Sequence, residues 1–310
     1  MLELVNVSKK FKKKYAVKNM NMYIEKGEII GLLGPNGAGK STTISIMSSL
    51  IDPTEGDVLL HQKSILKNPK PLRKIAGIVP QEIALYGDLT AKENLEFFGK
   101  IYKLSPKELP LRIKEVLEQI GLTDRQNDLA RTFSGGMMRR LNIGVALLHH
   151  PEFIIMDEPT VGIDPQSRKY ILETVKKLNK ELGMTVVYTS HYMEEVEFLC
   201  DRIYIMDRGD LIASGTKEEI KQIISSEHTL IIETDTINQT FIKLLKNEPK
   251  LRNILVEDKK VTALVAKEVN AFRTILKHAE EAKVELKSIE IQSPTLEDVF
   301  LHLTGRALRD

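Results

Sequence analysis

The chain has 310 residues, enough to bury a sizeable core and to form about two domains. Its formal net charge of +2 gives no electrostatic reason to expect a nucleic-acid partner, and its single cysteine, Cys200, excludes an internal disulfide. No apolar stretch approaches the ~18–20 residues that cross a bilayer, and residues 1–5 lack a signal-peptide pattern. The single cysteine fits a reducing cytosol, and if the protein acts at a membrane, another chain is expected to span it.

Strands and helices alternate along the first two thirds of the sequence. Strands are predicted at residues 2–7, 20–24, 29–33, 57–60, 75–79, 153–156, 185–189 and 202–206. Helices are predicted at residues 42–50, over most of residues 90–150, and between the strands at 153–156 and 185–189. This alternation predicts a mainly parallel sheet with helices on both faces and a helical insertion.

The pattern changes after about residue 221. The predicted order there is strand, helix, strand, strand, helix and strand, at residues 229–233, 237–246, 253–256, 261–265, 268–282 and 284–291. This βαββαβ order is that of the ferredoxin-like arrangement. We therefore expect an α/β domain over residues 1–220, with its helical insertion at about 90–150, and a small α+β accessory domain over residues 221–310.

A phosphate-binding loop is the strongest motif. Eight residues between a predicted strand and helix fit G-x-x-x-x-G-K-S/T: Gly34, Pro35, Asn36, Gly37, Ala38, Gly39, Lys40 and Ser41. Glycines let successive backbone N–H groups turn toward phosphate oxygens, and the following helix directs its positive end at the same anion. Lys40 is expected to reach the β- and γ-phosphates, and Ser41 to ligate Mg²⁺. The strand–loop–helix context disfavours a plain glycine turn.

Two carboxylates follow a second apolar strand, at Asp157 and Glu158. A carboxylate delivered at the end of a buried strand beside a phosphate loop suits Mg²⁺ coordination, which is the role predicted for Asp157. Glu158 is placed to orient or deprotonate an attacking water. Without the phosphate loop, a solvated acidic turn would be the better interpretation.

Ser134, Gly135 and Gly136 precede a predicted helix at residues 137–148. A serine hydroxyl, two glycines and a helix N-terminus form a second anion-binding surface. The same residues also make an ordinary helix N-cap. Their position ahead of the strand that leads to Asp157 is what makes them informative.

The order of these motifs resembles the ATP-binding subunits of ABC transporters. After the phosphate loop, the family's further motifs are matched by glutamine-loop Gln81, signature residues Ser134, Gly135 and Gly136, the Walker B strand ending at Asp157 and Glu158, D-loop Asp164 and switch His191. The resemblance implies the P-loop ATPase fold. It also implies that two such domains sandwich two ATP molecules, each site taking its phosphate loop from one subunit and its signature from the other.

The resemblance implies roles for single residues. Phe11 aligns with the aromatic residue that stacks on adenine, with Tyr15 as the second candidate. Gln81 would contact Mg²⁺ or water and report the nucleotide state to a membrane partner, and His191 would contact the γ-phosphate. The implied ATP-binding residues are Phe11, Gly34, Pro35, Asn36, Gly37, Ala38, Gly39, Lys40, Ser41, Thr42, Gln81 and Asp157. The implied catalytic residues are Lys40, Glu158 and His191, and the implied Mg²⁺ ligands are Ser41, Gln81 and Asp157.

Two positions depart from the commonest family pattern. Met137 stands in the signature where glutamine is usual, which removes one polar contact to the partner's nucleotide but leaves a side chain that can pack there. The D-loop, residues 161–164, keeps Asp164 without the usual serine. Because Lys40, Glu158 and His191 are all present, an active ATPase is expected.

Residues 137–140 and the C-terminal segment at residues 294–305 resemble the daunorubicin-resistance type of ABC exporter ATPase. The resemblance implies a homodimer on the inner face of the cell membrane, which powers separate permease subunits that export a drug, antibiotic or lipid. Two alternatives remain open. One is an ABC ATPase without a role in transport, and the other is a regulatory module that senses ATP.

Overall fold

The computed structural model describes residues 1–223, 227–266, 271–292 and 295–304. The chain divides into two compact units, with the boundary between Lys217 and Glu218. The first unit contains two sheets and the second unit one, and each unit has its own hydrophobic core. Among the described residues, no helix combines the length and the apolar character that a membrane crossing requires.

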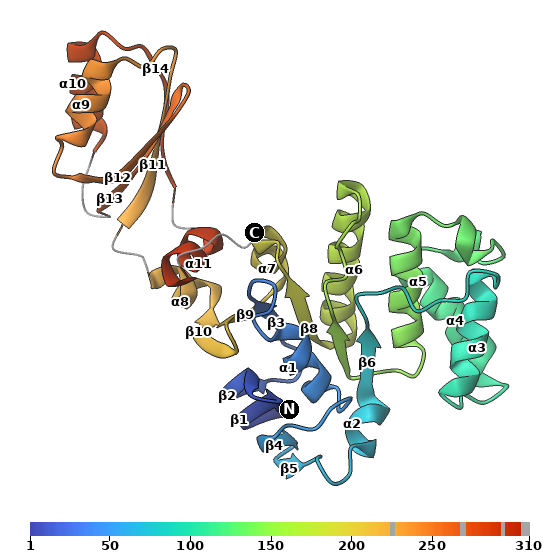
Figure 1. Cartoon of the computed structure of the whole chain (residues 1–310). Helices are drawn as coiled ribbons and strands as arrows, with labels where there is room; N and C mark the ends of the chain where they lie inside the picture. Colours follow the sequence, from blue (N-terminus) through green and yellow to red (C-terminus); the bar gives the residue numbers. More distant parts are fainter. Residues whose placement is uncertain (224–226, 267–270, 293–294, 305–310) are drawn as a thin grey trace. The chain divides into compact units, whose positions relative to one another are not determined.

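A six-stranded sheet forms the centre of the first unit (Figure 1). Its strand order is β10-β9-β3-β8-β7-β6, with bounds Asp210–Thr216, Arg202–Asp207, Ile29–Leu33, Thr185–Ser190, Phe153–Met156 and Ala76–Val79. All neighbours pair in parallel except β10, which turns back on β9. The predicted mainly parallel sheet is confirmed. The β9–β10 hairpin, which turns at Arg208 and Gly209, was not predicted.

A second, antiparallel sheet packs in the same unit and was not foreseen as a separate layer. Its order is β2-β1-β4-β5, with bounds Lys14–Ile24, Leu2–Phe11, Glu55–Leu60 and Lys63–Ser64. The first two predicted strands have no helix between them, so they pair as a hairpin, because parallel neighbours need a longer crossover. This sheet covers one side of the strand that leads into the phosphate loop (Figure 1).

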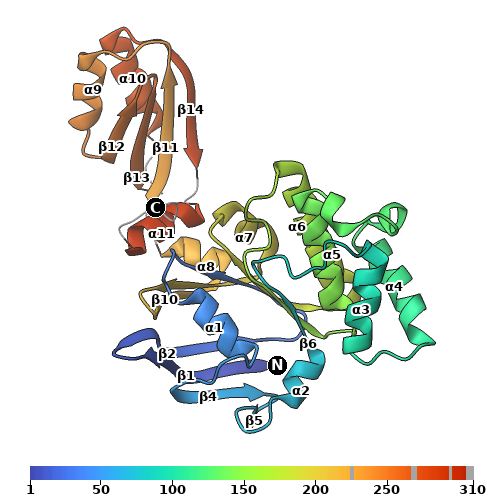
Figure 2. The ribbon, with the colours of Figure 1, turned by 45° about the vertical axis from the view of Figure 1, so that its right-hand side comes forward.

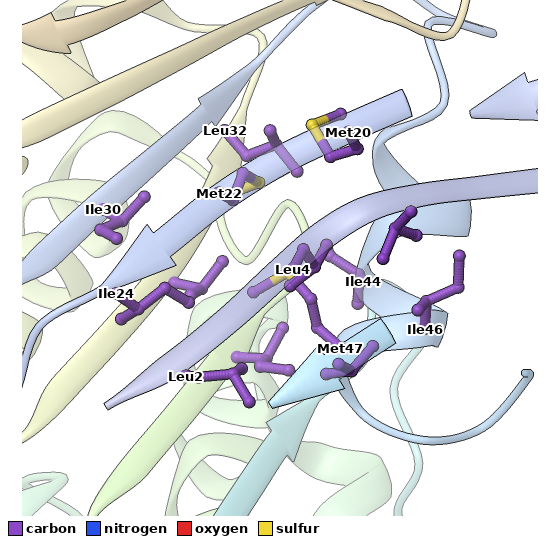
Figure 3. Packing of buried hydrophobic residues seen from close by; sticks show 14 of the residues in the cluster. Leu2, Leu4, Met20, Met22, Ile24, Ile30, Leu32, Ile44, Ile46 and Met47 are labelled. Carbon is purple, nitrogen blue, oxygen red and sulfur yellow. The ribbon is translucent and has the colours of Figure 1, made fainter. Parts of the chain in front are cut away.

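The main core lies between the two sheets and the first helix. Side chains of β1, β2, β3 and helix α1, Lys40–Met47, gather in one cluster, shown in Figure 3. Ile30 and Leu32 are fully buried there, and every residue of β3 is buried. The phosphate loop therefore starts from a strand that is held on both faces.

Helices supply the remainder of the first unit. They are α2 (Lys70–Ile75), α3 (Ala91–Ile101), α4 (Glu108–Gln119), α5 (Gly135–Leu147), α6 (Pro165–Leu182) and α7 (Met193–Leu199). Helices α3, α4 and α5 contact one another and form the helical insertion, with the short 3-10 turns η1 (Thr123–Arg125) and η2 (Ala130–Thr132) between α4 and α5 (Figure 1). Thr90 and Glu93 form a capping box that starts α3.

The second unit is a four-stranded antiparallel sheet with two helices on one face (Figure 2). Its elements are α8 (Lys217–Gln222, from the unit boundary), β11 (Glu227–Thr234), α9 (Gln239–Lys246), β12 (Leu251–Glu257), β13 (Lys260–Ala266), α10 (Phe272–Ala282), β14 (Leu286–Gln292) and α11 (Leu296–Thr304). The strand order β12-β13-β11-β14 confirms the ferredoxin-like arrangement. Residues 268–270 of the predicted helix, and residues 294 and 305 of the C-terminal segment, lie outside the described residues.

Candidate nucleotide-binding site

The phosphate loop joins β3 to α1 through glycines that no other residue could replace without strain. Gly39, the N-cap of α1, has φ of 109°, in the region that favours glycine. A Cβ atom at Gly39 would lie 2.4 Å from the carbonyl oxygen of Ala16. The loop backbone can therefore approach its neighbours, and a bound anion, more closely than a chain with side chains would allow.

Lys40 is folded back onto its own loop. Its side chain is 6% exposed, and its Nζ donates hydrogen bonds to the carbonyl oxygens of Gly34 at 2.7 Å and Pro35 at 3.3 Å. Burial lowers the pKa of Lys40, partly offset by the nearby carboxylates of Glu158 and Asp157. A polyphosphate at the loop would offer this buried ammonium a stronger, anionic acceptor.

A cavity of about 830 Å³ opens on the phosphate loop. Predicted residues in its lining are Phe11, Tyr15, Pro35, Asn36, Gly37, Ala38, Gly39, Lys40, Ser41, Thr42, Gln81 and Glu158. Four further cations line the same cavity, and the sequence analysis did not select them: Lys13, Lys14, Lys18 and Arg208. Their charges favour an anionic ligand of several charges.

Both candidate adenine-stacking residues line this cavity. Phe11 is 51% exposed, with Lys9 Nζ 5.4 Å from its ring centroid. Lys10 Nζ lies 5.0 Å from the ring centroid of Tyr15. The geometry provides an aromatic face at either position, so the choice between Phe11 and Tyr15 stays a prediction.

Glu158 is where three of the predicted residues meet. The Gln81 side-chain amide donates a hydrogen bond to its Oε2 at 3.2 Å. Lys40 Nζ lies 3.6 Å from Oε1, and His191 Nδ1 lies 3.7 Å from Oε2. These residues come from α1 and from the loops after β6, β7 and β8, so the parallel sheet brings its strand ends to one place.

Thr189 fixes the two adjacent carboxylate residues. Its hydroxyl donates to Asp157 Oδ1 at 2.8 Å and accepts from the backbone N–H of Glu158 at 2.8 Å. Glu158 itself has φ of 45°, a left-handed conformation that is uncommon outside glycine and that is found at functional sites. This role of Thr189 is not predictable from the sequence, because a threonine in a strand has no pattern that distinguishes a structural hydroxyl from an ordinary strand residue.

The predicted Mg²⁺ ligands have suitable chemistry. Burial raises the pKa of Asp157, with the hydrogen bond from Thr189 acting in the opposite direction. A cation beside this carboxylate would relieve that cost. Ser41, Gln81 and Asp157 supply hydroxyl, amide and carboxylate oxygens, the donor types that Mg²⁺ prefers, so the residues present fit the ion.

The signature residues are not among the described residues that line the cavity. Ser134 is the N-cap of α5, and its hydroxyl accepts from the backbone N–H of Met137 at 3.2 Å. A Cβ atom at Gly136 would lie 2.2 Å from Ser167 Oγ, so glycine lets α5 approach α6. A Cβ atom at Gly135 would lie 3.7 Å from the side chain of Ile163 in the D-loop. Within one chain Gly136 of the signature therefore lies against the start of α6.

Asp164 caps α6. Its Oδ1 accepts from the backbone N–H of Ser167 at 2.9 Å, and this hydrogen bond lowers the pKa of Asp164. The predicted D-loop aspartate thus has a local structural role. Four of the predicted site residues are not among the described residues that line the cavity: Asp164, Gly34, Asp157 and His191. Asp157 is connected to the cavity residue Glu158 through Thr189, and His191 contacts Glu158 directly.

Arg139 connects the signature helix to the glutamine loop. Its side chain is 4% exposed, and its guanidinium donates to the carbonyl oxygens of Pro80 at 2.7 Å and Gln81 at 2.7 Å. In the sequence, residues 137–140 carry only a family resemblance, and no motif assigns Arg139 a role. The position of Gln81 beside Glu158 therefore depends on a residue of the helical insertion.

Replacing Arg139 by methionine is expected to lower the free energy of unfolding by about 1.5–3 kcal/mol, because two charge-assisted hydrogen bonds are lost. Chemical denaturation followed by circular dichroism measures this change. The matched control is Arg131→Met, since the Arg131 side chain is 63% exposed in a surface ion pair with Asp88 and should contribute at most ~1 kcal/mol. Equal effects of the two substitutions would show that the Arg139 contacts are not important for stability.

Comparison with known proteins supports the class of ATP-binding cassettes. A family model described as ABC transporter matches residues 17–161, and one described as the C-terminal domain of DrrA1-3-like ATP-binding proteins matches residues 215–304. The dimeric ATP-binding cassette MJ0796, solved in a post-hydrolysis state bound to ADP and Pi, is 32% identical, with a TM-score of 0.63. The match covers 70% of this chain and 98% of that structure.

Two relatives match over nearly their whole lengths. The linearmycin resistance ATP-binding protein LnrL of Bacillus subtilis (strain 168) is 49% identical, over 100% of both chains. The daunorubicin resistance ATP-binding protein DrrA3 of Streptomyces coeruleorubidus is 32% identical, over 96% of this chain and 93% of its own. The chain belongs to the ABC transporter ATP-binding proteins and has a DrrA-like C-terminal domain. Membership implies ATP binding and hydrolysis, and cassettes of this family dimerise and work with membrane permease subunits.

Proposed function

We propose that the chain is the ATP-hydrolysing subunit of an exporter and powers a separate membrane permease from the cytoplasmic face. The observation that carries the proposal is the convergence on Glu158. The side chains of Lys40, Gln81 and His191 all lie within 3.7 Å of its carboxylate oxygens, beside the cavity at the phosphate loop. A regulatory module that only senses ATP would not need a buried carboxylate held among these groups.

We assign the following parts to the residues of the site. The loop backbone and Lys40 hold the β- and γ-phosphates, and Ser41, Gln81 and Asp157 hold Mg²⁺. The bound ion would neutralise part of the phosphate charge. Glu158 accepts a proton from the attacking water, and His191 is directed at the γ-phosphate. Phe11 or Tyr15 stacks on the base.

We also propose that the active form is a homodimer. Within one chain Gly136 lies against Ser167 of α6, and none of Ser134, Gly135, Gly136 and Met137 is among the described residues that line the phosphate-loop cavity. A second copy would place its signature at the cavity of the first copy, and the signature of the first copy would lie at the cavity of the second. One chain provides one phosphate loop and one signature, so two copies complete two sites.

An exposed aromatic group is the surface we assign to the permease. Tyr86 and Phe97 are 50% and 38% exposed, and their ring centroids lie 4.8 Å apart. Phe98 adjoins both rings, and Ile101 on the same helix is 56% exposed. This aromatic group lies beside the segment that follows Gln81, so contact with a permease could be transmitted to the nucleotide site.

The relatives suggest the cargo. One is named for linearmycin resistance and another for daunorubicin resistance. We infer export of a drug, antibiotic or lipid. Cells that express the chain with its permease should survive these compounds better than cells that express the Glu158→Gln variant, as measured by the minimal inhibitory concentration.

A second arm of this experiment separates transport from hydrolysis. Phe97→Glu should lower resistance while ATPase activity of the purified chain stays near the wild-type value, because the substitution changes only the exposed aromatic group. Lys92→Gln, on an exposed part of α3, is the control, because it makes the net charge more negative by the same one unit. ATPase activity without any gain in resistance for any compound would instead favour an ABC ATPase that does not act in transport.

A further inference from the structure

A second buried carboxylate lies behind the nucleotide site, on α7. Glu195 is 2% exposed, and its Oε2 accepts three hydrogen bonds from hydroxyl groups. The donors are Thr160 at 2.8 Å, Tyr188 at 2.9 Å and Ser190 at 2.7 Å. None of the motifs found in the sequence includes Glu195, and the roles assigned above for hydrolysis do not use it.

The charge of Glu195 has a partner across the helix interface. Arg168 of α6 places its Nε 3.4 Å from Glu195 Oε1. Burial, and then the charge of Glu195, raise the pKa of Tyr188 well above its usual range, so Tyr188 keeps its proton and can donate it to the carboxylate. An apolar side chain would fill this space without a desolvation cost. Unlike an apolar side chain, the Glu195 carboxylate accepts hydrogen bonds from three hydroxyl groups that approach it from different segments.

On one side this network fixes the turn that carries His191. The Ser190 hydroxyl donates to Glu195 and also accepts from the backbone N–H of Tyr192 at 2.9 Å, so it spans His191. The Arg168 guanidinium lies 4.1 Å from the ring centroid of Tyr192. The Tyr192 ring in turn lies 4.2 Å from the ring of His191, measured between centroids.

On the other side the network reaches the turn that carries Glu158. Thr160 follows Glu158 by two residues and precedes the D-loop. Its hydroxyl is fully buried with the carboxylate of Glu195. The turn is closed by a hydrogen bond from the backbone N–H of Val161 to the carbonyl oxygen of Glu158 at 3.3 Å. The Glu195 carboxylate therefore contacts both the turn that carries Glu158 and the turn that carries His191. The side chains of Glu158 and His191 lie 3.7 Å apart.

We propose that Glu195 is a positioning residue for ATP hydrolysis, which holds the turns of Glu158 and His191 in one fixed arrangement through Thr160 and Ser190. The inference rests on the proposed ATPase function. Glu195 acts through other residues and is not among the described residues that line the cavity at the phosphate loop. It should therefore affect the rate of the chemical step and leave nucleotide binding at the phosphate loop nearly unchanged.

The test is the steady-state ATPase activity of the full-length chain with Glu195→Gln, which keeps the shape and removes the charge. We expect kcat to fall about tenfold to a hundredfold, the scale found for outer partners of a reactive site, with KM for ATP changed less than about twofold. Ser190→Ala should cause a smaller loss of the same kind. Ser190→Ala also provides the test of the proposal if circular dichroism shows that Glu195→Gln is unfolded. Glu194→Gln, on the exposed neighbouring carboxylate, should leave both constants unchanged.

A double-mutant cycle distinguishes positioning from a general structural effect. If Glu195 acts through His191, Glu195→Gln should add little further loss of kcat in a His191→Ala chain. Fully additive losses, or wild-type kcat in both Glu195→Gln and Ser190→Ala, would overturn the proposal. If the wild-type chain turns over ATP no faster than Glu158→Gln, the proposed function itself fails and the inference falls with it.

Discussion

Replacing Glu158 by glutamine should lower ATP hydrolysis by about 10²–10⁴-fold, the usual scale of a lost general base, while ATP binding is retained. The amide keeps the size of the side chain but cannot accept a proton from water. Phosphate release under saturating ATP measures the loss, and calorimetric titration measures binding. With chemistry blocked, dimers with bound ATP should accumulate and elute earlier in gel filtration.

The matched control for this substitution is Glu152→Gln, at the other end of the same strand. Glu152 is half exposed and lies 3.4 Å from Lys26 in a surface ion pair, so its neutral form should hydrolyse ATP normally. Turnover close to wild type in Glu158→Gln would exclude Glu158 as the base and would shift attention to another acceptor in the cavity.

Lys40→Ala should raise the Kd for ATP by at least about tenfold to a hundredfold, because it removes charge-assisted hydrogen bonds to the phosphates. In the nucleotide-free chain the substitution should lower the free energy of unfolding by only about 0.5–1.5 kcal/mol. It removes two hydrogen bonds to loop carbonyl oxygens, but it also removes the cost of burying the ammonium. Calorimetric titration with ATP and thermal unfolding without ATP measure the two quantities.

Lys26→Ala is the control for Lys40→Ala, since the Lys26 side chain is 70% exposed and it is not among the described lining residues of the cavity. Its Kd for ATP should equal that of the wild type. If Lys40→Ala bound ATP as tightly as this control, the assignment of the phosphate loop would be wrong.

The large features of the fold follow from local signals in the sequence. Residues 29–33 and 153–156 are fully apolar or nearly so, and both form central strands of the parallel sheet. The separate antiparallel sheet was harder to foresee, because strand propensity does not say which partner a strand will choose. Its strand β1 pairs with β2 and also with β4, whose residues lie beyond α1.

The site likewise contains residues that the sequence predicts and residues that it does not. Lys40, Gln81, Glu158 and His191 belong to motifs, and three of them do surround the carboxylate of the fourth. Thr189, Arg139 and Glu195 hold these residues in place, yet each lies in an ordinary strand or helix of the sequence. Their roles depend on contacts between distant segments, which no local pattern contains.

The pairing of β3 has a consequence for how the protein comes into being. Residues 29–33 pair with residues 186–190 and 202–205, both of which lie far along the chain. Such non-local pairing is slow to form, because the chain loses the entropy of closing a long loop before the stabilising contacts between the strands can form. Strand β3, which leads into the phosphate loop, is thus made early on the ribosome but has neither of its paired strands until β8 and β9 have emerged. ATP that binds the folded site then stabilises the finished unit by mass action.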